Sequence, residues 1–210
     1  MTVHSFSSAA GAAAPLTRAR VSGSLPVWSL SLGCPKNRVD TEHLLGSLGM
    51  PVHSVEHMGR ARLVFINTCG FIEPAVRESI RSILDAVERL GRCKRRPLLA
   101  VAGCMVGRYG VKELAADLPE VDLWLPTGEL ENWPAAPGRL LSTGPSYAWL
   151  KVGEGCRHKC AFCTIPSIRG PLRSVPAADL REEARSLLAG GVRELVLVAQ
   201  DLTSWGSDFD

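Results

Sequence analysis

The first 130 residues alternate short apolar segments with helical segments, and this alternation narrows the fold more than any other feature of the chain. Strands are predicted at residues 27–32, 63–66 and 98–102, and the second of these is continuously apolar, as in a strand buried on both faces. Helices are predicted between them, and a further helix and strand follow near residues 108–118 and 121–125. Such βαβ repetition predicts an α/β fold with a largely parallel sheet and right-handed crossovers.

A cysteine follows each of the three strands. Cys34, Cys69 and Cys104 come just after the strand ends, and each has a glycine as its neighbour. In an open parallel sheet the carboxyl ends of the strands share one edge, where ligands bind, so we expect the three thiols to converge. The glycines would let the backbone approach a bulky centre closely. The alternative for each cysteine is a small buried apolar side chain. Cys93 is interpreted as an incidental surface thiol.

A second cysteine set forms one short loop at Cys156, Cys160 and Cys163, with the spacing Cys-x-x-x-Cys-x-x-Cys. Soft thiolates select zinc or an iron–sulfur cluster. A structural zinc ion requires a fourth protein ligand, and the nearby candidate, His158, lies awkwardly between the first two cysteines. Three ligands without a fourth favour a cubane cluster with one open iron, and a zinc knuckle is the alternative.

The surroundings of this loop are basic. Between residues 155 and 178 there is no acidic residue, and the basic ones are Arg157, Lys159, Arg169 and Arg173. This distribution favours a carboxylate or phosphate group near the loop, with a solvated basic loop as the alternative. The net charge of +3 is too small to indicate nucleic-acid binding by itself.

Cysteine usage and the amino terminus indicate the cellular setting. The chain of 210 residues has seven cysteines, an odd number, and no secretory signal, which predicts a reducing compartment, the cytoplasm. Residues 1–26 contain no acidic residue and are expected to be a disordered tail, with a transit peptide as the alternative. No apolar run reaches the roughly 18 residues of a membrane span, so no membrane association is expected.

Prolines and glycines gather at residues 131–146, which we interpret as a linker between domains at 27–130 and 147–210. In the second domain a strand at 147–152 leads into the cysteine loop, a helix starts at Pro176, and a strand follows at 194–199. The loop would thus lie at the top of the first βα unit of a barrel, where such folds hold their chemistry. Two strands do not close a barrel, so the second domain is expected to be incomplete and the chain a fragment.

Taken together, the two cysteine sets resemble those of the radical S-adenosylmethionine methylthiotransferases. Phe162, just before the last cysteine of the loop, matches the signature of that superfamily. The segments Ser-Leu-Gly-Cys-Pro-Lys-Asn (31–37), Asn-Thr-Cys-Gly-Phe-Ile (67–72) and Ile-Pro-Ser-Ile-Arg-Gly (165–170) look like the branch that modifies an aspartate of ribosomal protein S12. Arg38 departs from the leucine often found there. The resemblance implies a flavodoxin-like amino-terminal domain followed by the start of a radical-SAM partial barrel.

The resemblance also implies cofactors and partners. Cys156, Cys160 and Cys163 would hold a 4Fe–4S cluster whose open iron binds S-adenosylmethionine. An auxiliary 4Fe–4S cluster would be held by Cys34, Cys69 and Cys104. The implied reaction is methylthiolation of the β-carbon of an aspartate, with no protein acid or base assigned, and the fragment alone is expected to be inactive. The implied partners are ribosomal protein S12 or the small ribosomal subunit, an electron donor such as flavodoxin or ferredoxin, and a sulfur donor, with the protein itself a monomer.

Three other functions fit parts of the same pattern. A transfer-RNA adenosine methylthiotransferase shares the chemistry and differs in its substrate. An electron carrier with two clusters would bind no S-adenosylmethionine. A zinc-bound structural module would contain zinc and no labile sulfide.

Overall fold

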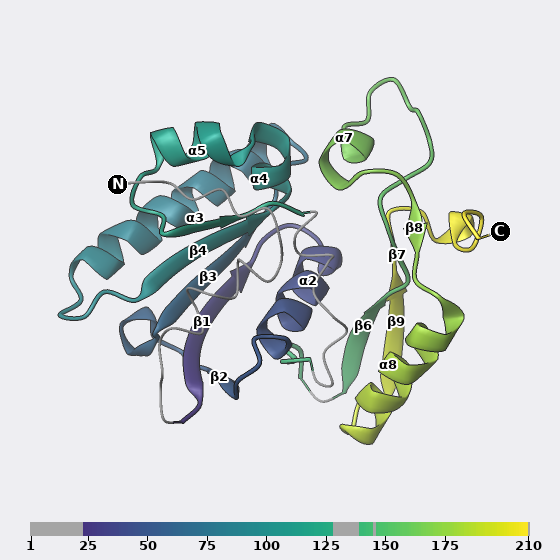
Figure 1. The fold of residues 1–210 in the computed structure, drawn as a ribbon, viewed down its shortest axis with the longest axis horizontal. Helices are drawn as coiled ribbons and strands as arrows, with labels where there is room; N and C mark the ends of the chain where they lie inside the picture. Colours follow the sequence, from purple (N-terminus) through teal and green to yellow (C-terminus); the bar gives the residue numbers. More distant parts are fainter. Residues whose placement is uncertain (1–22, 128–138, 145, 210) are drawn as a thin grey trace.

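The computed structural model describes residues 23–127, 139–144 and 146–209, and Figure 1 shows their arrangement. The strands of the larger sheet are β1 (Leu25–Ser31), β2 (Val52–Ser54), β3 (Leu63–Thr68), β4 (Leu98–Gly103) and β5 (Leu123–Leu125). They are connected by helices α2 (Pro35–Gly46), α3 (Glu73–Gly91), α4 (Cys104–Tyr109) and α5 (Val111–Asp117) and by the 3₁₀ turn η1 (Met58–Arg60).

All pairings in this sheet are parallel, and the strand order is β2-β1-β3-β4-β5. This is the flavodoxin-like order, so the predicted α/β fold with a flavodoxin-like sheet is confirmed. The central strand β3 is buried at every residue, as its continuous apolar run predicted. Its neighbours β1 and β4 are the strands that, like β3, lead into cysteines.

Helices α3, α4 and α5 cover one face of the sheet, and α2 covers the other (Figure 1). On the α3 side, Val64 and Ile66 of β3 join the cluster that contains Ile83. On the α2 side, Phe65 of β3 joins the cluster that contains Leu44. Successive residues of β3 therefore point to opposite faces, and burying both faces supplies the apolar driving force for this unit.

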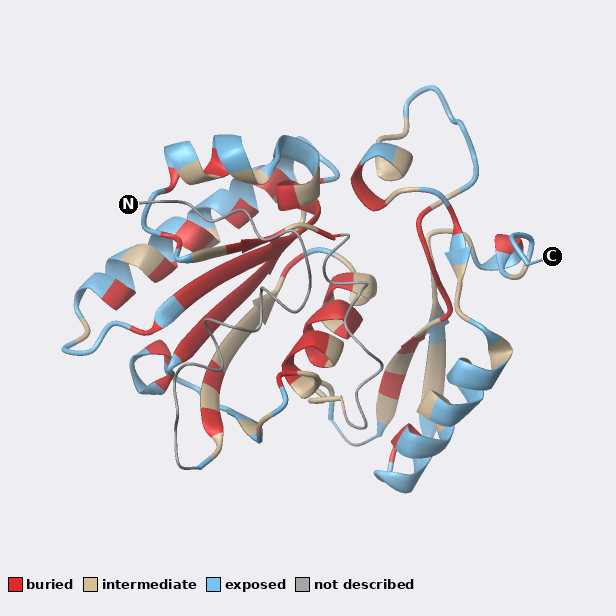
Figure 2. Cartoon of the chain, viewed as in Figure 1, coloured by how far each residue is buried: buried red, intermediate tan, exposed pale blue. Residues whose placement is uncertain are grey.

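Helix α2 is buried on its polar side as well as on its apolar side. Besides Val39 and Leu44, its buried residues include Asp40, Thr41 and Glu42. The reason is its position between the larger sheet and β6 (Tyr147–Lys151), visible in Figure 2 as a helix that is mostly red. Charged side chains in such a place need partners, since burying an unpaired charge is costly.

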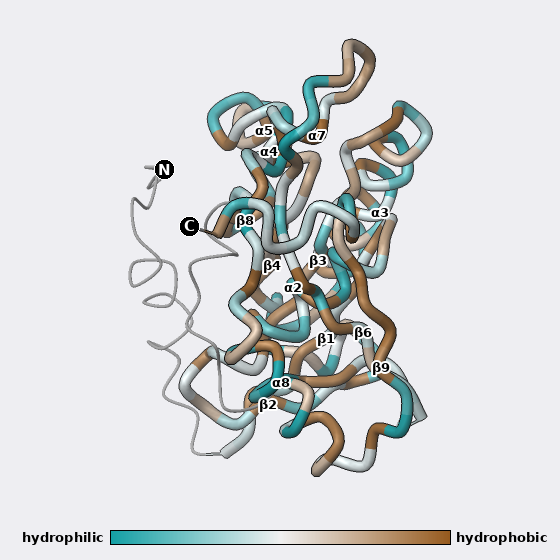
Figure 3. The backbone as a smooth tube through the Cα atoms, turned by 90° about the vertical axis from the view of Figure 1, so that its right-hand side faces the viewer, coloured by the Kyte–Doolittle hydropathy of each residue, from teal (hydrophilic) through white to brown (hydrophobic). Residues whose placement is uncertain are grey.

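The second unit is a βαβ arrangement. Strand β6 pairs in parallel with β9 (Glu194–Val198), and α8 (Ala177–Ala189) lies between them in the chain. Shorter elements are the antiparallel pair β7 (Gly153–Glu154) and β8 (Arg173–Ser174), helix α7 (Ile165–Arg169) and the 3₁₀ turn η2 (Leu202–Ser204). Leu197 of β9 is 53% exposed, and Figure 3, which faces this side of the molecule, colours β9 hydrophobic.

Some boundaries differ from those predicted. Strand β1 begins at Leu25, inside the segment expected to be a tail, while residues 1–22 lie outside the described residues. Most of segment 131–146 also lies outside them. The helix expected from residue 108 begins at Cys104 instead and is divided at Gly110, whose φ of 81° ends α4 before α5 starts. None of the helices in the described part of the chain is long and apolar enough to cross a membrane.

Gly103, at the end of β4, provides a test of the sheet edge. Its φ is 101°, and a Cβ there would overlap the Oδ1 atom of Asn67 and the carbonyl oxygen of Thr68. We expect Gly103→Ala to lower the free energy of unfolding by about 3 kcal/mol, through backbone strain and overpacking. Gly49→Ala is the control, because Gly49 has a φ of 69° but nothing within 4 Å of its Cβ position. It should cost about 1 kcal/mol. Equal costs for the two variants in urea unfolding would contradict the close approach of β3 and β4.

Candidate functional site

The first cysteine set lies at the carboxyl ends of three adjacent strands. Cys34 lies three residues beyond the end of β1 and directly before α2. Cys69 follows β3 directly, and Cys104 opens α4 directly after β4. The ladders pair Ser31 with Asn67 and Thr68 with Gly103, so the three strands end nearly level. The parallel order therefore brings all three thiols to one edge of the sheet.

Glycines allow the three turns to pack on one another. A Cβ at Gly33 would lie 2.7 Å from the Sγ and Cβ atoms of Cys69, and one at Gly70 would lie 2.6 Å from the backbone nitrogen of Met105. Any larger residue at position 33 would displace the Cys69 side chain. In this structure the glycines beside the cysteines thus permit close contact between neighbouring turns.

The thiol of Cys104 is buried and hydrogen-bonded. Arg169 Nε donates to its Sγ at 3.2 Å, and the Sγ lies 3.8 Å from Asn37 Oδ1. Burial raises the pKa of Cys104, the positive charge of Arg169 opposes this, and the charges of Cys34 and Cys69 add to the rise.

The donor set of this edge suits a soft metal, because three thiols from three turns converge on it. Asn37 supports the edge by donating from Nδ2 to the carbonyl oxygens of Leu32 (2.8 Å) and Thr68 (2.9 Å). Within the described residues, however, no three His, Cys, Asp or Glu side chains already form a group that could hold a metal ion.

The second cysteine set lies in a loop without helix or strand at residues 155–164. The loop is anchored by the Cys156 amide, which donates to the Gly170 carbonyl at 3.2 Å, and it turns where the Cys163 amide donates to the Cys160 carbonyl at 3.1 Å. Cys160 is exposed, and Cys156 and Cys163 are half-buried. An open hollow of about 520 Å³ adjoins the loop and is lined by Cys156, Arg157, His158 and Lys159, among others.

His158, the residue considered as a fourth zinc ligand, has another partner. Its Nε2 lies 2.9 Å from Oδ2 of Asp201. Hydrogen bonds from Ser204, Thr203 and His158 hold the pKa of Asp201 well below its usual range, so this carboxylate is charged at neutral pH. The ring is thereby directed toward η2, which disfavours a zinc site completed by His158.

Arg169 has a role that the sequence analysis missed. Its side chain is 2% exposed, and its Nη1 donates to Asp40 Oδ2 at 2.8 Å and to Glu154 Oε2 at 2.7 Å, while its Nη2 donates to Asn37. Arg169 is thus neither part of a solvated basic loop nor free to hold an anion. No local signal indicated this role, because Asp40 lies in a helix that is mostly polar around it, with only Val39 apolar beside it.

Lys151 completes this charge network. It contacts Asp40 and lies 3.0 Å from Glu154 Oε2, and Gln200 Nε2 donates to Glu154 Oε1 at 2.8 Å. Burial alone would raise the pKa of Asp40, but the charges of Lys151 and Arg169 outweigh it and lower that pKa. Burial alone would lower the pKa of Lys151, but Asp40 and Glu154 outweigh it and raise that pKa. Asp40 and Lys151 are therefore both charged at neutral pH.

A second buried network joins the same two units. Arg139, with a side chain 4% exposed, pairs with Glu42 of α2 and with Glu183 of α8, the latter at 2.7 Å. Its Nη1 also donates to the Trp149 carbonyl at 2.7 Å, and His43 Nε2 lies 2.9 Å from Glu183 Oε1. The larger sheet and the βαβ unit are consequently held together by charges from both.

Asp40→Asn tests the first network. We expect a loss of about 3 kcal/mol in the free energy of unfolding near pH 7, because Lys151 and Arg169 then share one carboxylate fewer in a buried place. The folded pKa of Asp40 is lowered, so its contribution is complete above the unfolded value of about 4 and declines as the pH falls through the folded value. The difference between variant and wild type should therefore shrink below about pH 4.

Asp85→Asn is the matched control, since Asp85 forms an exposed pair with Arg89 at 3.0 Å. It should change the free energy of unfolding by no more than about 0.5 kcal/mol. Urea unfolding across the acidic range measures both variants. A cost for Asp40→Asn that does not depend on pH would show that shape, and not charge, explains its effect.

Comparison with known proteins agrees with this description. A family model described as "Uncharacterized protein family UPF0004" matches residues 27–126. The protein named ribosomal protein uS12 methylthiotransferase RimO from Nitratidesulfovibrio vulgaris is 64% identical over 196 residues, which cover 88% of this chain and 46% of that protein. The proteins of the same name from Oleidesulfovibrio alaskensis and Lawsonia intracellularis are 59% and 52% identical, again over 46% of their lengths.

The chain thus spans about half the length of the curated relatives it matches. The similarity includes almost all of the described residues, and it extends beyond the UPF0004 match into the region of the second cysteine set. Residues 27–126 therefore match the UPF0004 family model, and the resemblance to the methylthiotransferases that the cysteine motifs indicated is confirmed.

Proposed function

We propose that this chain is the cluster-binding part of an enzyme that methylthiolates the β-carbon of an aspartate in ribosomal protein S12. The observation that carries the proposal is the convergence of Cys34, Cys69 and Cys104 at the carboxyl edge of one parallel sheet. The relatives are named ribosomal protein uS12 methylthiotransferases, and this supports the choice of substrate.

Each cysteine set would hold one 4Fe–4S cluster. Cys34, Cys69 and Cys104 would bind the auxiliary cluster, and Cys156, Cys160 and Cys163 the cluster that binds S-adenosylmethionine. The pairing of His158 with Asp201 supports three thiolate ligands in the loop without a fourth side chain. Bound there, the cluster and S-adenosylmethionine supply radical chemistry that can remove a hydrogen atom from an unactivated carbon.

The protein's own contribution is positioning. Arg157 and Lys159 line the hollow beside the loop and suit the carboxylate of a bound S-adenosylmethionine. Arg169 contacts the Cys104 sulfur and lies in α7, which follows the cysteine loop directly. It therefore links the position of the first cysteine set to the position of the second. We assign no protein acid or base.

The same proposal includes a division into domains at 27–130 and 147–210, with a linker at 131–146. The match to UPF0004, which ends at residue 126, supports the first boundary. An electron donor such as flavodoxin or ferredoxin and a separate sulfur donor are required by the chemistry and are proposed as partners.

Iron content tests the two sites. After anaerobic reconstitution with iron and sulfide we expect about eight irons per chain. Replacing Cys34, Cys69 and Cys104 together by alanine should remove about half of the iron and leave the spectrum of the other cluster. The triple variant of Cys156, Cys160 and Cys163 should do the converse.

Cys93→Ala is the control for these variants and should retain all of the iron, since Cys93 Sγ lies 3.6 Å from the Arg89 carbonyl oxygen at the carboxyl end of α3 and packs against the core cluster of that side. Zinc without labile sulfide would overturn the proposal in favour of a structural metal module. Loss of both clusters in either triple variant would contradict two independent sites.

The substrate is tested in the organism that encodes the protein. Deleting the gene should remove the methylthio group from ribosomal protein S12, as seen by mass spectrometry, and leave modified adenosine in transfer RNA unchanged. The reverse pattern would identify the transfer-RNA enzyme.

We also expect the 210-residue chain alone to add no methylthio group to S12 in vitro. Strands β6 and β9 form a sheet of two strands, and productive binding of a cofactor needs groups placed by several. Multiple turnovers by the reconstituted chain would contradict this expectation.

A further inference from the structure

A basic hollow lies at the edge of the sheet opposite to the cysteines. It has a volume of about 400 Å³ and is lined by the starts of three strands and the turns before them: Leu25, residues 59–63 and residues 95–98. Strand β3 has six residues and is therefore about 20 Å long, which separates this hollow from Cys69 at the other end. The hollow thus has no part in the cluster sites.

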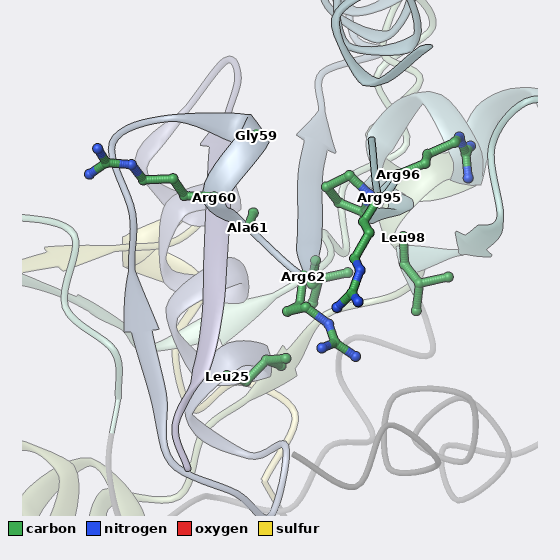
Figure 4. Close-up of a pocket in the computed structure, with 10 residues that line it drawn as sticks. Leu25, Gly59, Arg60, Ala61, Arg62, Arg95, Arg96 and Leu98 are labelled. Atoms are coloured by element: carbon green, nitrogen blue, oxygen red, sulfur yellow. The ribbon is translucent and has the colours of Figure 1, made fainter. Parts of the chain in front are cut away.

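Four arginines and no acidic residue line the hollow: Arg60, Arg62, Arg95 and Arg96 (Figure 4). Arg96 already has partners, because its Nη1 donates to both carboxylate oxygens of Asp122, at 2.9 and 2.7 Å. The side chains of Arg60, Arg62 and Arg95 form no hydrogen bond or ion pair within the part of the chain that the structure describes. By contrast, Arg89 and Arg92, at the nearby end of α3, each pair with a carboxylate four residues earlier.

Arg62 and Arg95 are held close together by the backbone. The Leu98 amide donates to the Arg62 carbonyl at 3.0 Å, and Figure 4 shows both guanidinium groups directed to the same part of the hollow, with Arg60 and Arg96 pointing away. Two like charges that converge without a carboxylate repel each other, and an anion between them removes that repulsion. Guanidinium groups recognise phosphate oxygens through paired hydrogen bonds.

We propose that this hollow binds the phosphodiester backbone of RNA, with Arg62 and Arg95 as a clamp on one phosphate. A polymer suits the site better than a single free phosphate. The guanidinium groups are exposed and each contact is weak, so affinity must come from several contacts along a chain of charges. Arg60 and Lys94, both exposed, extend the positive surface beyond the pair. Leu98, 38% exposed beside Arg95, offers an apolar surface to a base.

The inference rests on the proposed function only in its choice of RNA, because a ribosomal protein substrate lies among RNA strands. The cluster chemistry takes place at the other edge of the sheet. RNA binding can therefore be measured on the protein without iron, and its failure would not affect the iron counts or the modification of S12.

The test is fluorescence anisotropy of a labelled single-stranded RNA of about 16 nucleotides, titrated with the full chain at several salt concentrations. We expect Arg62→Gln/Arg95→Gln to lower the affinity about tenfold near 50 mM salt. It should also reduce the slope of log K against log salt by about 0.7, which corresponds to one phosphate contact on a single strand. Arg62→Lys/Arg95→Lys keeps the charges and should restore most of the slope.

The control is Arg181→Gln/Arg185→Gln on α8, which removes the same charge from exposed arginines that have no ion pair among the described residues. It should leave the affinity within about twofold of wild type. An equal loss in both double variants would overturn the proposal, because net charge alone would then explain binding. Tight binding of inorganic phosphate or of phosphatidylserine vesicles, without binding of RNA, would overturn it as well. Melting curves of all variants exclude a loss through unfolding.

Discussion

The buried guanidinium of Arg169 is the interaction on which the arrangement of this protein depends. Arg169 lies in the segment after the cysteine loop. Its guanidinium group donates to Asp40 and Asn37 of α2 and to the sulfur of Cys104. A buried arginine is stable only when its donors are satisfied, and here three of its nitrogens have acceptors. Removing the carboxylate of Asp40 or Glu154 would leave the buried charge of Arg169 less compensated, so these ion pairs favour one relative position of the two units.

This position has a consequence for chemistry. The carboxyl edge of the larger sheet and the loop of Cys156, Cys160 and Cys163 are connected through a single short helix, α7, which also packs on the first unit where Thr127 Oγ1 donates to the Ile168 carbonyl at 2.8 Å. A reaction that uses both cysteine sets needs them on the same side of the molecule. The charge networks of Arg169 and Arg139 provide that placement through packing and ion pairs, without a covalent link.

The two edges of the sheet have different properties. Because all its strands are parallel, the turns that follow strands lie at one edge and the turns that precede strands lie at the other. Turns after strands contain the cysteines and the glycines that let them approach, and turns before strands contain Arg62 and Arg95. Thiols and guanidinium groups are therefore about one strand length apart. The separation would let one small sheet hold the proposed soft-metal site and the proposed anion site without mutual interference.

Much of this could be predicted from local sequence. The period of apolar residues determined the strands and helices, their alternation determined the parallel sheet, and the position of Cys34, Cys69 and Cys104 after strands determined their common edge. These features depend on neighbours in the chain, which a sequence displays directly. The start of α4 at Cys104 was missed because Gly103, in a conformation that only glycine adopts readily, lets the strand turn directly into the helix.

Only the tertiary structure decided the roles of the charged residues. Asp40, Glu154 and Arg169 lie far apart in sequence, and their side chains are polar, so local pattern assigns them to solvent. Their burial follows from the packing of β6 on α2. Whether each charged side chain is stable there depends on partners that only the fold brings within hydrogen-bond distance. The same holds for His158, whose partner Asp201 comes from another loop. Local sequence thus determined the elements and the positions of the thiols, and long-range contact decided which charges are paired and which, like those of Arg62 and Arg95, have no partner in the part of the chain that the structure describes.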